Sequence, residues 1–458
     1  MISVKPPSGT RDFLAADIFK QRQVIDVIQQ VYESFGFEPL ATPAFENLST
    51  LLGKYGEEGD QLLFRILKRG DKLQTAAASS PGDQNELSDL ALKYDLTVPL
   101  ARVMARYGGQ LPKFFKRYQI QPVWRADRPA KGRFREFIQC DLDVCGSAAP
   151  VVEAEVLAAA CTVYDRLQFP DYSIVINHRE VLRGLIEASG IPLALEGTAL
   201  VAIDKLDKIG KEGVAVELSQ RGFKNEQATK LLALLDETSA ANSNRACLQF
   251  LRDRLTRPAA LAGLDNLTNI LKLSEATPAG QRLRVVPSLA RGLSYYTGAI
   301  FEAVAPASAG SFGGGGRYDG LLGMFSGQHI PACGFSIGLD RLLLLLEQQN
   351  YFNTERRFVD VLFANFSDTL ADTLAAANRL RQCGLVCEVF PDSKSLKQQF
   401  NYAATRQVRF MAFLGTSELQ AGELRFKRQS DGIEITLSLA ELESGLDKIA
   451  PSEENGKI

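Results

Sequence analysis

The earliest regular pattern of apolar positions in the chain is helical. Apolar residues recur every three or four positions across residues 18–35, and Gly36 then ends the pattern. The apolar residues that share one face are Ile18, Val24, Ile25, Ile28, Val31 and Tyr32. Residues 37–51 follow as an extended stretch interrupted by Pro39 and Pro43. The sequence therefore predicts an amphipathic helix and then an extended segment.

Alternation of polar and apolar residues predicts a β-hairpin over residues 116–145. In its second arm, Gln139, Asp141 and Asp143 alternate with apolar residues, so the three polar side chains lie on one face. The connecting sequence ADRPAKGR holds a proline and a glycine, which favour a loop. The polar face is either a solvent-exposed side of a sheet or the wall of a site that holds an amine or an imidazole beside a phosphate.

The pattern changes again in the second half of the chain. Residues 186–275 are rich in Ala, Leu, Lys and Glu, which indicates a mostly helical insertion. Strand-like sequence resumes over residues 282–304, and a run of glycines occupies 313–316. The segment ACGFSIGLDRLLLLLEQ at 332–348 then predicts a strand, a glycine turn and a buried helix.

A separate pattern begins near residue 358. Strand, helix, strand, helix and strand follow one another in VDVLFA, DTLADTLAAANRLRQCG, LVCEVF, SLKQQFNYAATRQ and RFMAFLG. Strands that alternate with helices of this length are typical of a compact α/β domain with parallel pairing. Residues 451–458 predict a disordered tail.

Composition sets limits on the function. The chain has 458 residues, a formal net charge of −2 and 45% hydrophobic residues, which is ordinary for a globular protein of several domains. No run of about 18 apolar residues occurs, and the first residues lack the apolar stretch of a secretory signal, so we expect a cytoplasmic protein that spans no membrane. Two histidines are too few for a histidine-rich metal site and argue against a Ser-His-Asp triad. Seven cysteines without CxxC spacing are expected to be small buried thiols.

Local charge differs from the whole-chain value. Residues 102–135 hold ten basic side chains and a single acid, Asp127. The basic residues are Arg102, Arg106, Lys113, Lys116, Arg117, Arg125, Arg128, Lys131, Arg133 and Arg135. Such a cluster is typical either of a site for nucleotide or nucleic-acid phosphate, or of a solvated basic surface.

A second candidate anion site lies at the start of the leucine-rich helix near residue 340. Arg341 follows Gly338 there, and a helix N-terminus offers free N–H groups and a positive dipole to an anion. Helix capping alone would explain the same residues. Neither GxxxxGKS/T nor a GxGxxG after a strand is present, so a bound ATP would not be held by a P-loop or a Rossmann domain.

Taken together, these segments resemble the class II aminoacyl-tRNA synthetases, and within them the histidyl-tRNA synthetase family. TPAFE at 42–46 is similar to motif 1 of that class, VWRADRPAKGRFREFIQCDLDVCG at 123–146 to motif 2, and GFSIGLDRL at 334–342 to motif 3. RGLSYYTGAIFE at 291–302 and GGGGRYDGL at 313–321 resemble two histidine-specific motifs. The resemblance covers almost the whole chain, and the order and spacing of the motifs make it specific.

The resemblance implies an α+β fold, in which an antiparallel-sheet catalytic core carries a helical insertion and a C-terminal α/β anticodon-binding domain follows. The expected parts are the catalytic core in two pieces, 1–185 and 276–347, the insertion at 186–275, the anticodon-binding domain at 358–450 and the tail at 451–458. Motif 1 implies a homodimer, because it builds the dimer interface in that class.

The resemblance also implies roles for individual residues. Arg125, Asp127, Arg133 and Arg341 would bind ATP. Arg291 would contact the reacting carboxylate and the α-phosphate, and with Arg125 and Arg341 it would carry the catalysis. The residues expected to bind histidine are Asp95, Thr97, Gln139, Asp143, Tyr295, Tyr296 and Tyr318. No metal held by the protein itself is implied, and Mg²⁺ would accompany the ATP.

Three positions depart from the usual sequence of the family. Ser294 in RGLSYY stands where the family usually has an aspartate. Asp95 and Asp143 stand where many bacterial members have glutamate, and aspartate at both positions resembles the eukaryote-type branch.

The reaction implied by the resemblance is ATP-dependent ligation of L-histidine to tRNA(His) through a histidyl-adenylate. One alternative is the histidine-binding regulatory subunit of a histidine-biosynthesis phosphoribosyltransferase, which typically lacks the anticodon domain. A second alternative is a tRNA-sensing module, which is usually fused to a kinase. The α/β pattern after residue 358 disfavours the first alternative, and the lack of kinase sequence disfavours the second.

Overall fold

The computed structural model describes residues 3–239, 241–290, 295–306, 308, 310–352 and 358–449. The chain divides into two compact units, Met1–Phe352 and Asn353–Ile458. Each unit has hydrophobic clusters of its own. The predicted tail at 451–458 lies outside the described residues.

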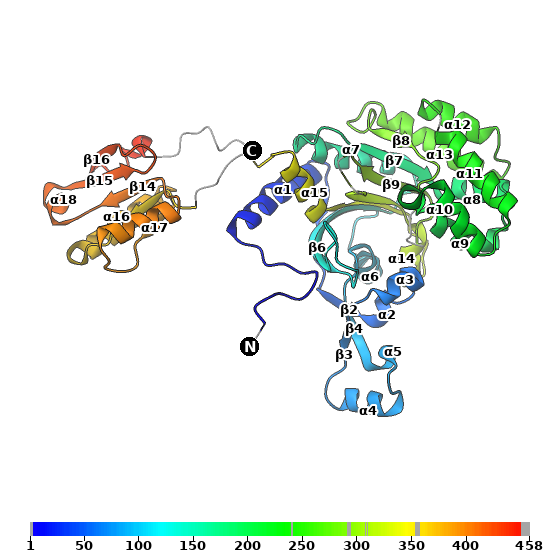
Figure 1. The fold of residues 1–458 in the computed structure, drawn as a ribbon, viewed down its shortest axis with the longest axis horizontal. Helices are drawn as coiled ribbons and strands as arrows, with labels where there is room; N and C mark the ends of the chain where they lie inside the picture. The colour runs from blue at the N-terminus through cyan, green and yellow to red at the C-terminus, as the bar shows by residue number, and fades with distance from the viewer. Residues whose placement is uncertain are drawn as a thin grey trace. The chain divides into compact units, whose positions relative to one another are not determined.

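A mainly antiparallel sheet organises the first unit (Figure 1). The strands, in their order across the sheet, are β1 (Glu38–Pro39), β5 (Phe115–Trp124), β6 (Glu136–Cys145), β11 (Ala332–Gly338), β10 (Gly313–Arg317), β9 (Ala299–Val304), β7 (Ser173–His178) and β8 (Leu283–Val285). The outermost pairs β1–β5 and β7–β8 are parallel, and the other pairs are antiparallel. The predicted hairpin is confirmed as β5 and β6, and its register places Asp143 opposite Arg117.

The glycine run forms β10, a strand that the sequence pattern did not predict. Glycine is required because the adjacent strand leaves no room for a side chain. A Cβ on Gly315 would lie 2.0 Å from the carbonyl oxygen of Gly334 on β11. A Cβ on Gly334 would in turn lie 1.9 Å from Oδ1 of Asp143 on β6. The β10 backbone therefore lies close to the β11 backbone, and the Asp143 carboxylate lies directly against β11.

Helices pack on the centre of this sheet. α7 (Val151–Arg166) and α15 (Leu339–Gln348) pack on β6 and β11, and α1 (Ala15–Ser34) packs on both helices. α1 is the helix predicted from the spacing of apolar residues. Its buried side chains are Gln21, Val24, Val27, Ile28, Val31 and Tyr32. Ile28 is fully buried, so its truncation to alanine would cost about 2–5 kcal/mol of stability.

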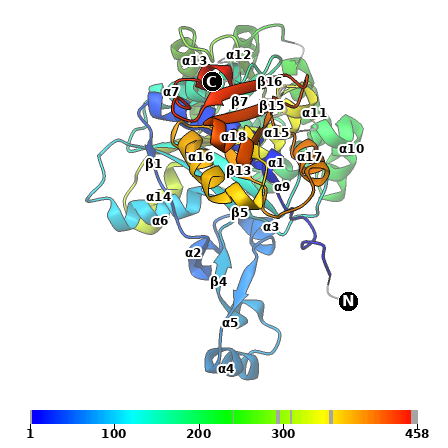
Figure 2. The same ribbon diagram turned by 90° about the vertical axis from the view of Figure 1, so that its left-hand side faces the viewer.

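Residues 45–92 form an arm that projects from the sheet in Figures 1 and 2. Its strands pair in the order β2-β4-β3 and are antiparallel. The elements are β2 (Phe45–Asn47), α2 (Leu48–Leu51), α3 (Gly56–Gln61), β3 (Arg65–Leu67), α4 (Asp71–Ser79), α5 (Gln84–Leu87) and β4 (Ser88–Leu92). The extended stretch predicted for residues 37–51 is confirmed in part, because its last residues form α2. After the arm, α6 (Thr97–Tyr107) packs against α14 (Asp319–Ser326).

The predicted helical content of residues 186–275 is confirmed, although the first helix begins earlier. The helices are α8 (Arg179–Ala188), α9 (Glu196–Ile203), α10 (Leu206–Gln220), α11 (Asn225–Ser239), α12 (Asn244–Arg252) and α13 (Pro258–Ser274). His178 caps α8, because its Nδ1 accepts a hydrogen bond of 3.1 Å from the Glu180 N–H. Buried residues of the insertion belong to the same hydrophobic cluster as the sheet, so the insertion shares the core of the first unit.

The second unit has a five-stranded sheet with the order β13-β12-β14-β15-β16. Its elements are β12 (Val361–Phe363), α16 (Leu370–Gln382), β13 (Cys387–Val389), α17 (Leu396–Thr405), β14 (Phe410–Phe413), α18 (Thr416–Ala421), β15 (Glu423–Arg428) and β16 (Glu434–Ser438). The predicted alternation and parallel pairing are confirmed for β12 to β14. β15 and β16 were not predicted. They extend the sheet beyond β14, and each pairs with its neighbour in the antiparallel direction.

Within the described residues, no helix is long and apolar enough to cross a membrane. The prediction for the cysteines is confirmed. All seven are free thiols, and six of them are buried whereas Cys383 is half-buried.

Candidate active site

The polar face of β6 is buried. Gln139, Asp141 and Asp143 are 8%, 2% and 3% exposed, so the alternative of a solvent-exposed sheet face is wrong. Alternation shows which side chains share a face, but it does not show what packs over that face. Side chains from other segments cover this face: Arg117 on β5, Ser336 on β11 and Tyr318 just after β10 all contact these residues. Buried polar groups need partners, and each of these three residues has them.

Asp143 is held by a cation and a phenol. Nη2 of Arg117 lies 2.8 Å from Oδ2 of Asp143, and Tyr318 donates its hydroxyl to Oδ1. Arg117 is itself fully buried, and it also donates to the carbonyl oxygen of Leu96 at 3.2 Å. Burial raises the pKa of Asp143, and the charge of Arg117 opposes that rise. Arg117 was not predicted as a site residue, although its position opposite Asp143 follows from the register of the predicted hairpin.

Asp141 lies between the other two polar residues of β6. Burial raises the pKa of Asp141 to about 7, the charge of Arg117 opposes this rise, and the neighbouring Asp143 adds to it. Nε2 of Gln139 donates to Oγ of Ser336 on β11 at 2.6 Å, which fixes the amide beside the carboxylates. The face therefore presents two buried carboxylates and an amide, with Arg117 paired to one of the carboxylates.

Asp95 lies just before α6 and accepts three hydrogen bonds. The Val98 N–H donates to Oδ1 at 3.1 Å, the Tyr55 hydroxyl donates to Oδ1 at 3.0 Å, and the Tyr295 hydroxyl donates to Oδ2 at 3.4 Å. Burial raises the pKa of Asp95, and these donors oppose the rise. Thr97 is the first residue of α6 and is half-buried. The start of α6 thus presents Asp95 to the tyrosine cluster.

The predicted tyrosines come together, but not as expected. Tyr295 and Tyr296 precede β9, so the strand-like pattern predicted over residues 282–304 is wrong at these two residues. Both are buried, and the Tyr295 ring lies 5.0 Å from that of Tyr296 and 6.1 Å from that of Tyr318. Because Tyr295 reaches Asp95 and Tyr318 reaches Asp143, the rings connect two carboxylates that are distant in sequence. Arg291 and Ser294 lie outside the described residues.

Arg125 lies between the acidic face of β6 and the arginines Arg133 and Arg341. Its Nε donates to the carbonyl oxygen of Tyr94 at 3.0 Å, and its Nη2 donates to Oε1 of Gln139 at 3.3 Å. The guanidinium also lies over the Tyr94 ring, 4.3 Å from its centre. These contacts fix the planar group in one orientation, as recognition of an anion by two parallel hydrogen bonds requires.

Three arginines gather at the other end of the site. Arg341 donates from Nε to the carbonyl oxygen of Gly132 at 3.1 Å, and so ties the start of α15 to the loop between β5 and β6. Arg133 on that loop is 53% exposed and pairs with Asp127 at 2.8 Å. Burial lowers the pKa of Arg341, and the charges of Arg133 and Arg125 lower it further. Mutual repulsion of this kind is relieved by an anion bound among the guanidiniums.

The basic cluster at 102–135 divides into different roles. Arg102 is bonded by two hydrogen bonds to Glu46 and Arg117 pairs with Asp143, so these two charges are neutralised within the fold. Lys116 is bonded to Glu155 and to a main-chain carbonyl. The side chains exposed to solvent are Arg106, Lys113, Arg128, Lys131 and Arg133. Charge density along the chain therefore did not reveal which of these cations have partners within the fold.

The antiparallel sheet, the arginine cluster at its end and the buried acidic face define the catalytic unit of a class II aminoacyl-tRNA synthetase. Residues 9–342 match the profile described as Histidyl-tRNA synthetase, and residues 359–449 match the profile described as Anticodon binding domain. The chain belongs to the histidyl-tRNA synthetase family. It is accordingly a ligase enzyme.

Relatives and solved structures agree with this assignment. The chain is 41% identical to the histidine–tRNA ligase of Gloeobacter violaceus, with 91% of this chain and 92% of that protein covered. It is 40% identical to the histidine–tRNA ligase of Christiangramia forsetii, with 96% and 98% covered. The crystal structure of histidyl-tRNA synthetase from Nostoc sp. PCC 7120 superposes with a TM-score of 0.77 at 29% identity, covering 98% of this chain and 100% of that one.

The alternative of a regulatory subunit is not favoured. A structure from Bacillus halodurans, described as an ATP phosphoribosyltransferase regulatory subunit/histidyl-tRNA synthetase, matches with a TM-score of 0.72 at 20% identity. At that identity the likeness shows a shared fold alone. The close relatives over the whole chain are instead histidine–tRNA ligases, and the anticodon-binding profile matches the second unit.

Proposed function

We propose that the enzyme joins L-histidine to tRNA(His) in two steps at the site described above. In the first step a carboxylate oxygen of histidine attacks the α-phosphorus of ATP, the bond to the β-phosphate breaks, and pyrophosphate leaves. In the second step a terminal ribose hydroxyl of the tRNA attacks the carbonyl carbon of the adenylate, and AMP leaves. Both steps need positioning and charge stabilisation more than a covalent side-chain nucleophile.

The arginine end is the proposed ATP site. Arg125 and Arg341 would hold the phosphates, and Arg133 on the exposed loop would reach the terminal phosphate, with Asp127 holding Arg133 in place. The support for this assignment is that Arg125 and Arg133 lie near enough to Arg341 for their positive charges to lower its pKa. Mg²⁺ would arrive with the nucleotide, held mainly by phosphate oxygens. The described residues contain no group of three or more His, Cys, Asp or Glu placed to hold a metal ion on their own.

The acidic end is the proposed histidine site. Asp95, Thr97 and Gln139 would receive the α-ammonium group, and Asp143 would accept a hydrogen bond from the imidazole. Tyr295, Tyr296 and Tyr318 would enclose the ring. Gln139 is bonded to Arg125, so the amide stands where the two ligands would meet.

Arg291 is the proposed catalytic residue for the first step. The family's motif places an arginine against the reacting carboxylate and the α-phosphate, where negative charge grows in the transition state. A guanidinium is always charged and can bond two oxygens at once, which suits this task.

The remaining partners are part of the same proposal. The second unit would bind the anticodon of tRNA(His), as its family match suggests. Two chains would form a homodimer through the arm, where Phe45 on β2 is 51% exposed at an edge of the sheet β2-β4-β3. A cytoplasmic location belongs to the proposal as well.

The observation that supports the proposal is the link from Arg125 through Gln139 to the buried acidic face, since it would bring the proposed ATP site next to the proposed histidine site. Exchange of labelled pyrophosphate into ATP tests it directly. We expect exchange with histidine and with none of the other nineteen standard amino acids. Exchange with a different amino acid, or none with histidine, would contradict the proposal.

A further inference from the structure

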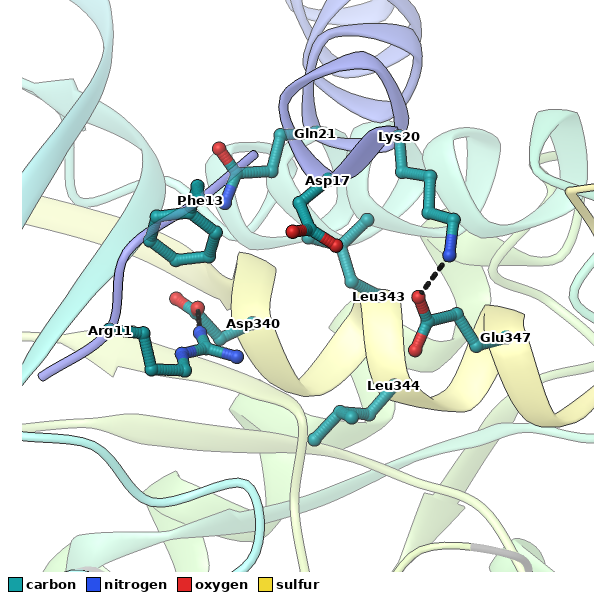
Figure 3. Close-up of a pocket in the computed structure, with 9 residues that line it drawn as sticks. All are labelled: Arg11, Phe13, Asp17, Lys20, Gln21, Asp340, Leu343, Leu344 and Glu347. Carbon is teal, nitrogen blue, oxygen red and sulfur yellow. Dashed lines mark hydrogen bonds and ion pairs between the residues drawn. The ribbon is translucent and has the colours of Figure 1, made fainter. Parts of the chain in front are cut away.

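A segment ahead of α1 contacts the proposed ATP site from outside. Residues 8–13, here called the N-terminal strap, cross from the loop between β5 and β6 to the start of α15. Figure 3 shows Arg11 of the strap directed at Asp340, with Phe13 on the strap and Leu344 on α15 nearby. None of the proposed roles in catalysis or ligand binding uses this segment.

Arg11 neutralises a buried carboxylate next to a proposed catalytic arginine. Its guanidinium forms an ion pair with Oδ1 of Asp340, whose side chain is only 6% exposed. Oδ2 of Asp340 accepts a hydrogen bond of 3.0 Å from the Ile138 N–H on β6. Asp340 immediately precedes Arg341, so Arg11 and Ile138 together fix the backbone from which Arg341 extends.

The same guanidinium packs on the loop that carries Arg133. Its Cζ lies 3.5 Å from the centre of the Phe134 ring, which is close stacking for an arginine on an aromatic ring. Arg11 therefore contacts Phe134 and Asp340, which are adjacent in sequence to the proposed phosphate ligands Arg133 and Arg341.

The main chain of the strap reinforces this contact. The carbonyl oxygen of Gly9 accepts a hydrogen bond of 2.7 Å from the Arg135 N–H, and that of Ser8 accepts one of 3.3 Å from Arg135 Nη1. Arg135 also donates from Nε to the carbonyl oxygen of Asp127 at 3.1 Å. Gly9 has φ +83°, and a Cβ there would lie 2.8 Å from Cγ of Arg135, so the close approach depends on glycine.

We propose that Arg11 is a positioning residue for adenylate formation, which sets the loop arginine Arg133 and the helix arginine Arg341 at the spacing that ATP requires. The inference rests on the proposed function, because it takes those two arginines as phosphate ligands. Arg11 itself would not touch ATP. It acts through Phe134 and Asp340, and small displacements of charged groups that hold a reacting phosphate are costly to rate.

The chain offers a matched control for this inference. Lys20 on α1 pairs with Glu347 on α15 at 2.6 Å, and both side chains line the same pocket as Arg11 (Figure 3). Glu347 lies two helical turns beyond Asp340, away from the loop. The two side chains are 35% and 40% exposed, and such surface pairs contribute little to stability.

The experiment compares Arg11→Ala, Arg11→Lys, Phe134→Leu and the control Lys20→Ala in pyrophosphate exchange, with Arg341→Ala as the reference. For Arg11→Ala we expect KM for ATP to rise, or kcat to fall, by about tenfold or more, with KM for histidine changed by less than about twofold. Arg11→Lys should recover part of the loss, since it restores charge without the planar stack. Phe134→Leu should share the ATP-specific defect, and Lys20→Ala should behave as wild type.

Three results would overturn the inference in distinguishable ways. If Arg341→Ala impairs use of ATP but Arg11→Ala and Phe134→Leu do not, the inference fails and the proposed ATP site stands. If Arg341→Ala leaves the use of ATP unchanged, the proposed site fails and the inference fails with it. A variant of Arg11 that melts early and loses ATP and histidine affinity equally would show a purely structural role, which also overturns the inference.

Discussion

Arg117 and Asp143 face each other across β5 and β6 as an ion pair of 2.8 Å whose side chains are 0% and 4% exposed. Two charges withdrawn from water in this way depend on each other, because either one left alone would be an uncompensated buried charge. The carboxylate proposed to select the imidazole is therefore also part of the core. Substitutions at Asp143 will affect both specificity and stability, and the two effects have to be measured separately.

Replacing Asp143 with asparagine keeps the size of the side chain and removes its charge. We expect kcat/KM for histidine to fall by more than tenfold, on the order of 1.5–3 kcal/mol, because a charged hydrogen bond to the ring is lost. KM for ATP should stay near the wild-type value in the same pyrophosphate-exchange assay. The free energy of unfolding should also fall, by about 3 kcal/mol, because Arg117 loses its counter-charge.

A suitable control is Asp265→Asn, which breaks the surface pair with Arg252 on the insertion. It should change neither the melting temperature nor the kinetics appreciably, since Asp265 is 62% exposed. A loss of ATP affinity in Asp143→Asn, with histidine affinity retained, would assign the residue to the nucleotide site instead.

Asp141 predicts a dependence of stability on pH. Its pKa is about 7 in the folded protein against an ordinary value of 3.8, so the folded state keeps a proton that the unfolded chain has already lost. The stabilising contribution of Asp141 is therefore present at low pH and disappears as pH rises through about 7. Relative to Asp141→Asn, the wild type should lose at most about 4 kcal/mol between about pH 4 and pH 8. Urea unfolding of both proteins across this range measures the difference, and a difference that does not vary with pH would contradict the assignment.

Arg291 is the strongest candidate for a residue that acts in the transition state. We expect Arg291→Ala to lower the rate of adenylate formation by roughly 10²–10⁴, by analogy with other arginines that serve phosphoryl transfer. Arg291→Lys should recover only part of the rate, and transfer from preformed adenylate to tRNA should suffer less. Rapid-quench measurement of pyrophosphate release separates the steps. An Arg291→Ala protein that melts early yet forms adenylate at a nearly normal rate would indicate a structural role instead.

Removal of the second unit should separate the two half-reactions. Residues 1–352 retain the sheet, the arginine cluster and their own core, so pyrophosphate exchange should persist at a similar rate. Charging of tRNA(His) should fall sharply, because the proposed anticodon contacts are lost. Circular dichroism should first establish that the truncated protein is folded. Equal losses in both assays of a folded protein would mean that the second unit supports the catalytic site itself.

A homodimer predicts about twice 50.2 kDa in light scattering at micromolar concentration. Phe45→Glu on β2 should shift the protein toward the monomer, because it would place a charge in the proposed apolar interface. Leu195→Glu is a control on the insertion, where a similarly exposed leucine lies away from the arm. A wild-type monomer with full activity would contradict the prediction of a homodimer.

Local patterns in the sequence were sufficient for many of the elements. The spacing of apolar residues predicted α1, and alternation predicted β5 and β6, because both features depend on neighbours in the chain. The alternation also placed Gln139, Asp141 and Asp143 on one face. It could not show that this face is buried, since Tyr318 and Ser336, which contact Asp143 and Gln139 on it, lie 175 and 197 positions further along the chain.

The other differences share that cause. β10 was missed because its glycines carry no periodic pattern, and the need for them comes from Gly334 on another strand. Arg117 was counted in the basic cluster at 102–135 and not as a partner of Asp143, because its partners, Asp143 and the Leu96 carbonyl, are fixed by pairing and packing. β15 and β16 are an exception, because they alternate in ELRFKR and EITLS and a local signal for both strands was present in the sequence.

The glycines of β10 and β11 have a consequence for attempts to change the amino acid that the enzyme accepts. Where Gly315 and Gly334 lie, any other residue would collide with a carbonyl or with the Asp143 carboxylate itself. Directed evolution therefore has almost no stepwise route through β10 and β11 beside Asp143, since a single substitution at these glycines would disrupt the sheet before it changed the proposed histidine site. A library aimed at a new substrate should leave these strands unchanged and vary Tyr295, Tyr296 and the residues around Asp95, where side chains rather than backbone set the shape.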